Sequence, residues 1–210
     1  GDKGNSTYKK SKFGNALIDK IVLEVLKKSS SPFNVIDFFP SGSDERQFSS
    51  PGINLNIGSL MRTPYAQFDE YHTSADNLSF MDSSCLNDSF DKYCQIIMLL
   101  EKQNSLTDEL DETNFDFCSD EYKDSDFDNS KKYLSLNPKC EPQLGKRGLY
   151  RMIGGQKDSD LDEMSIFWIL CFSDGNHSLK YIANRSGIAL EILEKTANLL
   201  CEKNLLKSIS

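Results

Sequence analysis

Long hydrophobic runs, paired cysteines and histidines are scarce in this sequence. No apolar run in its 210 residues approaches the ~20 residues that cross a bilayer, so we expect no membrane partner. The six cysteines include no Cys-x-x-Cys pair, which argues against a cysteine zinc site. Free thiols are typical of a reducing compartment, and we predict a cytoplasmic protein. Only His72 and His177 could supply an imidazole to a metal ion or a reaction.

Basic residues are fewer than acidic residues, and the acidic excess is local. Residues 104–130 hold ten acidic residues and one basic residue, Lys123, a net charge of −9. The whole chain carries −8, so the remainder carries +1. A nucleic-acid-binding face needs clustered positive charge, so we expect no nucleic-acid partner. We interpret residues 104–132 as an acidic linker or insertion.

An initiator methionine is absent too. The chain begins Gly1-Asp2-Lys3-Gly4, without a charged and then apolar leader. We therefore interpret the sequence as a fragment of a longer protein.

The first hundred residues predict an α/β sheet layer. Apolar pairs recur with helical spacing over 14–28, and short β-rich runs follow at 33–39 and 53–61. A polar loop is expected at 40–52 and a longer one at 62–77, before a helix at 83–102. Ligands of such sheets bind beyond the carboxyl ends of the strands, so both loops are candidates for one functional edge.

The last eighty residues predict a small, mainly helical domain. Helices are expected at 161–172, 179–185 and 189–203, with Asp174-Gly175 ending the first of them. Ser178 is the expected cap of the second helix, and Gly187 makes the turn to the third. A short helix, a glycine turn and a longer helix form a helix-turn-helix. The domains are thus expected at 1–103 (sheet part), 104–132 (acidic linker) and 133–210 (connector and helical domain).

The two polar loops contain the groups that could do chemistry. The first loop places Asp44, Glu45 and Arg46 in succession, which could equally form weak local ion pairs on a solvated surface. In the second, His72 has carboxylates nearby that could orient a metal-binding imidazole. Taken alone, His72 is also compatible with an ordinary surface histidine, and His177 with a structural role in a turn.

Two blocks of the sequence nevertheless resemble the end of the co-catalytic zinc aminopeptidase fold. They are Ser43–Ile53 (SDERQFSSPGI) and Glu70–Asn77 (EYHTSADN). Members of that superfamily carry a Ser-Asp-His-x-x-Phe-x-x-x-Gly-Ile block, then a Tyr-His-Thr-x-x-Asp block whose histidine binds zinc. More closely, the chain resembles an aminopeptidase-like bacterial family with a C-terminal winged helix, also in its segments EPQLGKRGLY (141–150) and SDGNHSL (173–179).

The resemblance implies a zinc-dependent hydrolase of peptide or related amide bonds, with one or two zinc ions. His72 matches the zinc-binding histidine, and Asp2 lies near, but shifted from, the place of a metal-binding aspartate. Glu45 departs from the superfamily, which usually has histidine there. The remaining ligands and the general base would lie upstream of Gly1, so the fragment alone is expected to be inactive. The residues that would contact substrate are Asp44, Glu45, Arg46 and Tyr71.

Two other functions remain open at this point. An aminopeptidase-like fold that has lost metal ligands would be a catalytically inactive binding module. A winged helix could instead make the protein a DNA-binding regulator. The charge of residues 189–203, with three glutamates and two lysines, argues against the regulator because phosphate would be repelled. A homo-oligomer is compatible with either function.

Overall fold

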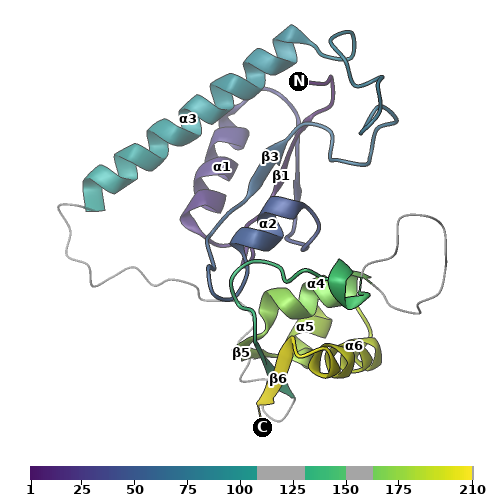
Figure 1. The fold of residues 1–210 in the computed structure, drawn as a ribbon. Coiled ribbons are helices and arrows are strands. Elements are labelled where there is room, and N and C mark those ends of the chain that lie inside the picture. Colours follow the sequence, from purple (N-terminus) through teal and green to yellow (C-terminus); the bar gives the residue numbers. More distant parts are fainter. Residues whose placement is uncertain (108–130, 150–162, 210) are drawn as a thin grey trace. The chain divides into compact units, whose positions relative to one another are not determined.

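The computed structural model describes residues 1–107, 131–149 and 163–209, which form a mixed α/β protein of two compact units (Figure 1). One unit comprises Gly1–Phe38 and Ile57–Ser119, and the other comprises Phe39–Asn56 and Asp120–Ser210. We call them the N-terminal and C-terminal units. The predicted acidic segment lies outside the described residues from 108 to 130, although α3 includes its first four positions.

The N-terminal unit is built on a three-stranded sheet with the order β2-β1-β3. β1 (Ser6–Lys9) pairs parallel with β2 (Phe33–Ile36) and antiparallel with β3 (Ser59–Met61). α1 (Leu17–Lys28) makes the crossover from β1 to β2 that a parallel pair requires. The helix predicted at 14–28 is confirmed with a later start, and the strand predicted at 33–39 is confirmed with an earlier end.

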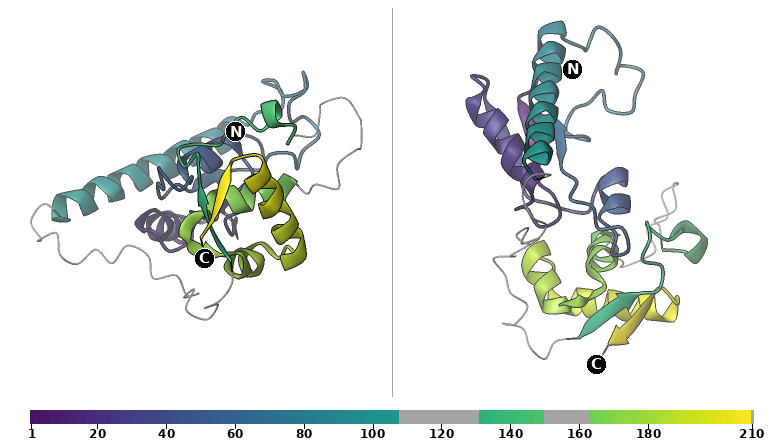
Figure 2. Two further views of the ribbon diagram at one scale, coloured as in Figure 1. Left: turned by 60° about the horizontal axis from the view of Figure 1, so that its bottom comes forward. Right: turned by 90° about the vertical axis from the view of Figure 1, so that its left-hand side faces the viewer.

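One apolar core holds this unit together. Two views show α1 lying along α3 (Ser83–Thr107) (Figures 1 and 2). Apolar side chains of both helices pack with Tyr8 of β1. Each helix contributes apolar side chains that recur with helical spacing and so lie on one face. Burying these two facing stripes stabilises the unit. The buried members of this core are Tyr8, Ile21, Val22, Val25, Leu26 and Ile96.

Two predictions for this region are wrong. Residues 40–52 are not all loop, because α2 spans Ser43–Phe48. The strand expected at 53–61 is reduced to Ser59–Met61, since the Leu55 N–H donates to the Phe48 carbonyl at 2.9 Å and Asn54 has a φ of 49°. These turn bonds after α2 use the backbone groups that a strand ladder would need.

The C-terminal unit contains a winged helix. β4 (Lys132–Ser135) lies between β5 (Asp174–Ser178) and β6 (Leu206–Ile209) in an antiparallel sheet. α4 (Glu163–Phe172), α5 (Leu179–Ser186) and α6 (Leu190–Glu202) pack together beside it. A short 3-10 turn, η2 (Gly145–Arg147), lies in the connector.

The predicted helix-turn-helix is confirmed in its details. The Ser178 side chain accepts the Tyr181 N–H, and Gly187 adopts the left-handed conformation (φ 71°) that ends α5. Asp174-Gly175 does not simply end the preceding helix, because residues 174–178 form β5. The start of the helix expected at 161 lies outside the described residues.

His177 has a structural role in this unit. Its Nδ1 lies 2.9 Å from an oxygen of Asp174, and its ring packs against those of Phe172 and Tyr181. Burial acts to raise the pKa of Asp174, but the hydrogen bond and charge of His177 and two backbone N–H groups outweigh it and lower the pKa to about 2.

This carboxylate gives the C-terminal unit a defined acid sensitivity. Because the pKa of Asp174 is lowered on folding, its stabilising contribution is complete above pH 4 and is lost as the pH falls towards 2. We expect about 2 kcal/mol of unfolding free energy to disappear over that interval. Urea unfolding followed by the fluorescence of the single tryptophan, Trp168, measures this. Asp174→Asn should flatten the decline between pH 4 and pH 2, and an unchanged slope would contradict the assignment.

Candidate functional site

The loop between β3 and α3 carries the predicted metal ligand, His72. Residues 62–82 form a succession of turns, with backbone bonds such as Tyr71 N–H to Phe68 carbonyl (3.2 Å) and Thr73 N–H to Glu70 carbonyl (3.0 Å). His72 has a φ of 58° and an exposed side chain. The left-handed conformation is uncommon for a residue with a side chain, so the turns impose it locally.

Aromatic stacking fixes the orientation of the His72 ring. The Tyr71 and His72 rings lie 3.9 Å apart, centroid to centroid, and are nearly parallel at 16°. Tyr71 in turn meets Phe68 edge-on, and Phe68 stacks on Phe80 near the start of α3. The imidazole is therefore presented to solvent from a row of rings, which suits a side chain that must offer a nitrogen to a ligand.

A complete metal site is not formed by the part of the chain that the structure describes. Within residues 1–107, 131–149 and 163–209, no group of three histidine, cysteine, aspartate or glutamate side chains could hold a metal ion. Catalytic zinc usually has three protein ligands. His72 alone does not meet that requirement, so the zinc expected from the resemblance does not fit the described residues by themselves.

Asp2, the second expected metal ligand, is engaged in hydrogen bonds within the N-terminal unit. Its carboxylate accepts the Gly4 N–H at 2.7 Å and the Thr63 hydroxyl at 2.6 Å. Burial acts to raise the pKa of Asp2, but these bonds prevail and lower it. The structure thus gives Asp2 a role in tying the chain start to the residues after β3, and its role as a ligand stays a prediction.

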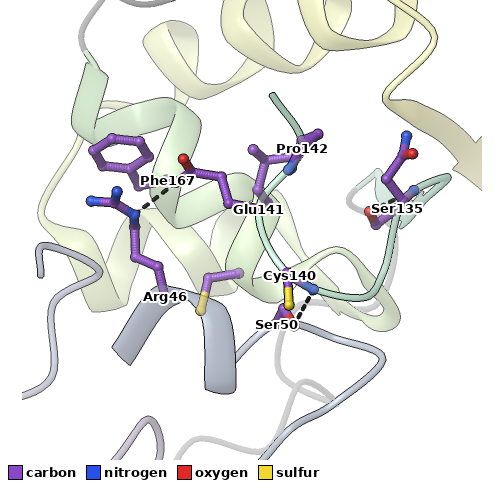
Figure 3. A pocket seen from close by; sticks show the side chains of 10 residues that line it. Arg46, Ser50, Ser135, Cys140, Glu141, Pro142 and Phe167 are labelled. Atoms are coloured by element: carbon purple, nitrogen blue, oxygen red, sulfur yellow. Dashed lines mark hydrogen bonds and ion pairs between the residues drawn. The ribbon is translucent and has the colours of Figure 1, made fainter. Parts of the chain in front are cut away.

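The other expected site residues lie on α2, in the C-terminal unit. Asp44 is exposed, whereas Glu45 is buried with 7% of its surface exposed. Arg46 points into its own unit: Nε lies 2.7 Å from Oε2 of Glu141, and the guanidinium is centred 4.0 Å from the Phe167 ring (Figure 3). The structure brings Tyr71 and His72 together. The α2 residues belong to the other unit, and their place beside His72 stays a prediction.

The cavity beside Arg46 is too small for a substrate. It holds about 20 Å³, room for a water molecule, and the Ser50 hydroxyl on its wall accepts the Cys140 N–H at 3.0 Å (Figure 3). The Gly52 N–H also donates to the Pro138 carbonyl at 2.7 Å, and a Cβ on Gly52 would come within 3.0 Å of that residue. These contacts attach α2 to the winged helix.

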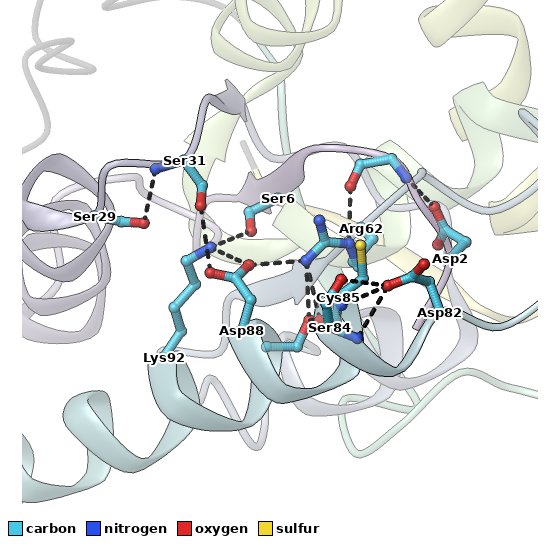
Figure 4. Close-up of polar contacts among 12 residues, drawn as sticks. Asp2, Ser6, Ser29, Ser31, Arg62, Asp82, Ser84, Cys85, Asp88 and Lys92 are labelled. Carbon is cyan, nitrogen blue, oxygen red and sulfur yellow. Dashed lines mark hydrogen bonds and ion pairs between the residues drawn. The ribbon is translucent and has the colours of Figure 1, made fainter.

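A buried charge network in the N-terminal unit was not predicted from the sequence. Asp88 binds both Arg62 Nη1, at 2.8 Å, and Lys92 Nζ, at 2.5 Å, and Lys92 also donates to the Ser6 hydroxyl (Figure 4). Burial acts to raise the pKa of Asp88, but the two cations prevail and lower it. The spacing of Asp88 and Lys92, four residues apart on one helix, was the available signal. The network joins β1, β3 and α3.

Comparison with known proteins identifies both parts of the chain. Residues 1–103 match the family described as "Domain of unknown function (DUF4910)", and residues 131–208 match "winged helix-turn-helix". A protein of Clostridium acetobutylicum is 48% identical over 209 residues and is named "Putative polysaccharide biosynthesis protein with aminopeptidase-like domain". The chain resembles this aminopeptidase-like protein along its whole length. The recognised resemblance and the α/β fold with a winged helix are thereby confirmed.

The match covers all of this chain but only part of its relatives. It spans 42% of the Clostridium acetobutylicum protein. A solved structure described as "Crystal structure of putative peptidase" from the same organism is 45% identical; the match covers the whole chain and 40% of that structure, with a TM-score of 0.47. The chain thus corresponds to about two-fifths of each relative.

No helix among the described residues is long and apolar enough to cross a membrane.

Proposed function

We propose that the protein is a zinc-dependent aminopeptidase-like hydrolase of peptide or related amide bonds, and that His72 supplies one zinc ligand. The observation that carries this proposal is the imidazole of His72, exposed on a turn and held against Tyr71 at 3.9 Å. A ligand whose ring plane is set before binding loses little freedom when it binds. The names of the relatives, aminopeptidase-like and peptidase, support the reaction class.

The proposed site needs groups beyond those that the structure describes. His72 is one donor, and the other zinc ligands and the general base would come from elsewhere in the protein. A zinc ion held by His72 and those further ligands would supply an activated water and polarise the scissile carbonyl. Asp44 stays a predicted substrate contact, and Arg46 is held by Glu141.

Hydrolysis of aminoacyl substrates tests the proposal. The full product of the gene should release a chromophore from aminoacyl p-nitroanilides in the presence of zinc, whereas the 210-residue chain should not. The described residues of the 210-residue chain lack a metal-binding group of three. Activity of this chain alone would therefore contradict the proposal that the other zinc ligands come from elsewhere in the protein. A zinc-loaded full product that cleaves neither peptides nor amides would remove the hydrolase assignment.

A catalytically inactive binding module is the second candidate, and the same incomplete ligand set favours it. In that case the full product would bind aminoacyl ligands without cleaving them. We do not favour DNA binding, because α6 exposes Glu191 and Glu202 beside Lys195.

A further inference from the structure

α3 carries a second apolar face that the N-terminal unit leaves uncovered. One side of this helix enters the core through Ile96, with Leu99 and Leu100 packed against it. About a quarter-turn away, four side chains recur at positions i, i+4, i+7 and i+11, and all are exposed. We call them the α3 stripe: Leu86, Phe90, Tyr93 and Ile97.

The exposure of this stripe is unusual for an isolated surface helix. Phe90 is 65% exposed, and Ile97 is 56% exposed. A helix that is apolar over so wide an arc is typically buried on two sides. Exposed apolar side chains gathered on one face of a helix are typical of an interaction site.

A groove runs beside the stripe along the edge of the sheet. Its volume is about 360 Å³, and its walls combine Leu86 and Phe90 of α3 with Leu60 and Met61 of β3. β3 is an edge strand, since β1 is its single partner in the described sheet. A strand with no strand partner on its outer side, next to an apolar groove, is a site where a further strand or helix can pack.

The floor of the groove is polar, and its charged side chains already have hydrogen-bond partners. Arg62 and Lys92 line it, and both are held by Asp88 (Figure 4). The Tyr93 hydroxyl donates to the Leu60 carbonyl at 2.6 Å, which ties the stripe to the strand edge. The groove is therefore a fixed surface, and what it lacks is apolar contact above it.

We propose that the α3 stripe and the β3 edge dock the region of the aminopeptidase-like protein that its relatives carry outside the match to this chain. More than half of the Clostridium acetobutylicum relative lies outside that match. A three-stranded sheet is small, and a sheet of the usual five or six strands would need partners at such an edge. The occupant would be apolar, adding secondary structure beside β3 and over α3. It is the same chain, not a second copy, that covers this face.

Hydroxyl-radical footprinting with mass spectrometry tests the docking surface. We expect oxidation of Phe90 and Tyr93 to be several-fold slower in the full gene product than in the 210-residue chain. Ile192 of α6, which is 41% exposed, serves as the internal control and should react equally in both. Equal oxidation of Phe90 and Tyr93 in the two proteins would overturn the proposal. Protection of the full product that appears only when its measured mass doubles would assign the face to a second copy, and would overturn it too.

A pair of variants gives an independent test. Phe90→Glu with Ile97→Glu should lower the melting temperature of the full product while leaving that of the 210-residue chain nearly unchanged, because both side chains are exposed in the chain alone. Gln95→Glu, on the polar side of the same helix, is the matched control and should change neither. Equal effects of the double substitution on the two proteins would contradict docking, whatever the hydrolase assay shows.

Discussion

His72→Ala is expected to lower kcat/KM of the full gene product for aminoacyl substrates by at least about 100-fold, since loss of a group that merely orients a metal ligand already costs 10–100-fold. The physical reason is that the sequence has a single other imidazole. His177, the second histidine, belongs to the other compact unit and is held by Asp174. The measurement is initial-rate kinetics at saturating zinc.

Ser74→Ala is the matched control for this substitution. Ser74 lies two residues further along the same exposed loop, and the bond to the Asn77 amide uses the Ser74 backbone carbonyl, which the substitution keeps. Its kcat/KM should stay within twofold of the unaltered protein, on the order of the scatter expected for surface substitutions. If His72→Ala and Ser74→Ala are equally active, His72 is a surface histidine and the proposed function fails.

Asp19→Ala is expected to lower the unfolding free energy of the N-terminal unit by about 3 kcal/mol or more, because several buried donors lose their acceptor at once. Asp19 is 1% exposed at the start of α1. Its carboxylate accepts the Tyr8 hydroxyl and the Ser11 N–H, each at 2.8 Å, and the Ala16 N–H at 2.9 Å. It therefore joins β1, the β1–α1 turn and α1.

Urea unfolding followed by far-UV circular dichroism measures this loss, and Trp168 fluorescence reports the C-terminal unit separately. Asp37→Ala is the control: Asp37 is 86% exposed and forms an ion pair with Lys10, so its removal should cost at most about 1 kcal/mol. A change of less than 1 kcal/mol for Asp19→Ala would mean that the surrounding donors find other partners.

The elements with strong patterns were predictable from the sequence. α1 and α6 show apolar spacing over three turns, and Ser178 and Gly187 mark the two ends of α5. The strand β1 was not predicted, because its residues STYK are polar in composition. It forms a strand because it lies between β2 and β3 and pairs with both of them.

The candidate site was predictable only as far as local sequence reached. Tyr71 and His72 are adjacent, and their stacking is a local event. Arg46 was expected to face a substrate cleft, and the structure shows it in contact with Glu141. These two residues are far apart in the sequence, so a local pattern of charges could not predict their contact. The assignment of α2 to the C-terminal unit depends on the same long-range contacts.

Zinc content is the most direct test of the central claim that His72 is a metal ligand. Elemental analysis of the purified full gene product should find one or two zinc ions per chain, and His72→Ala should lose zinc while Ser74→Ala keeps it. A well-folded full product that holds no zinc even after zinc is supplied, or a His72→Ala variant with an unchanged zinc content, would contradict the account.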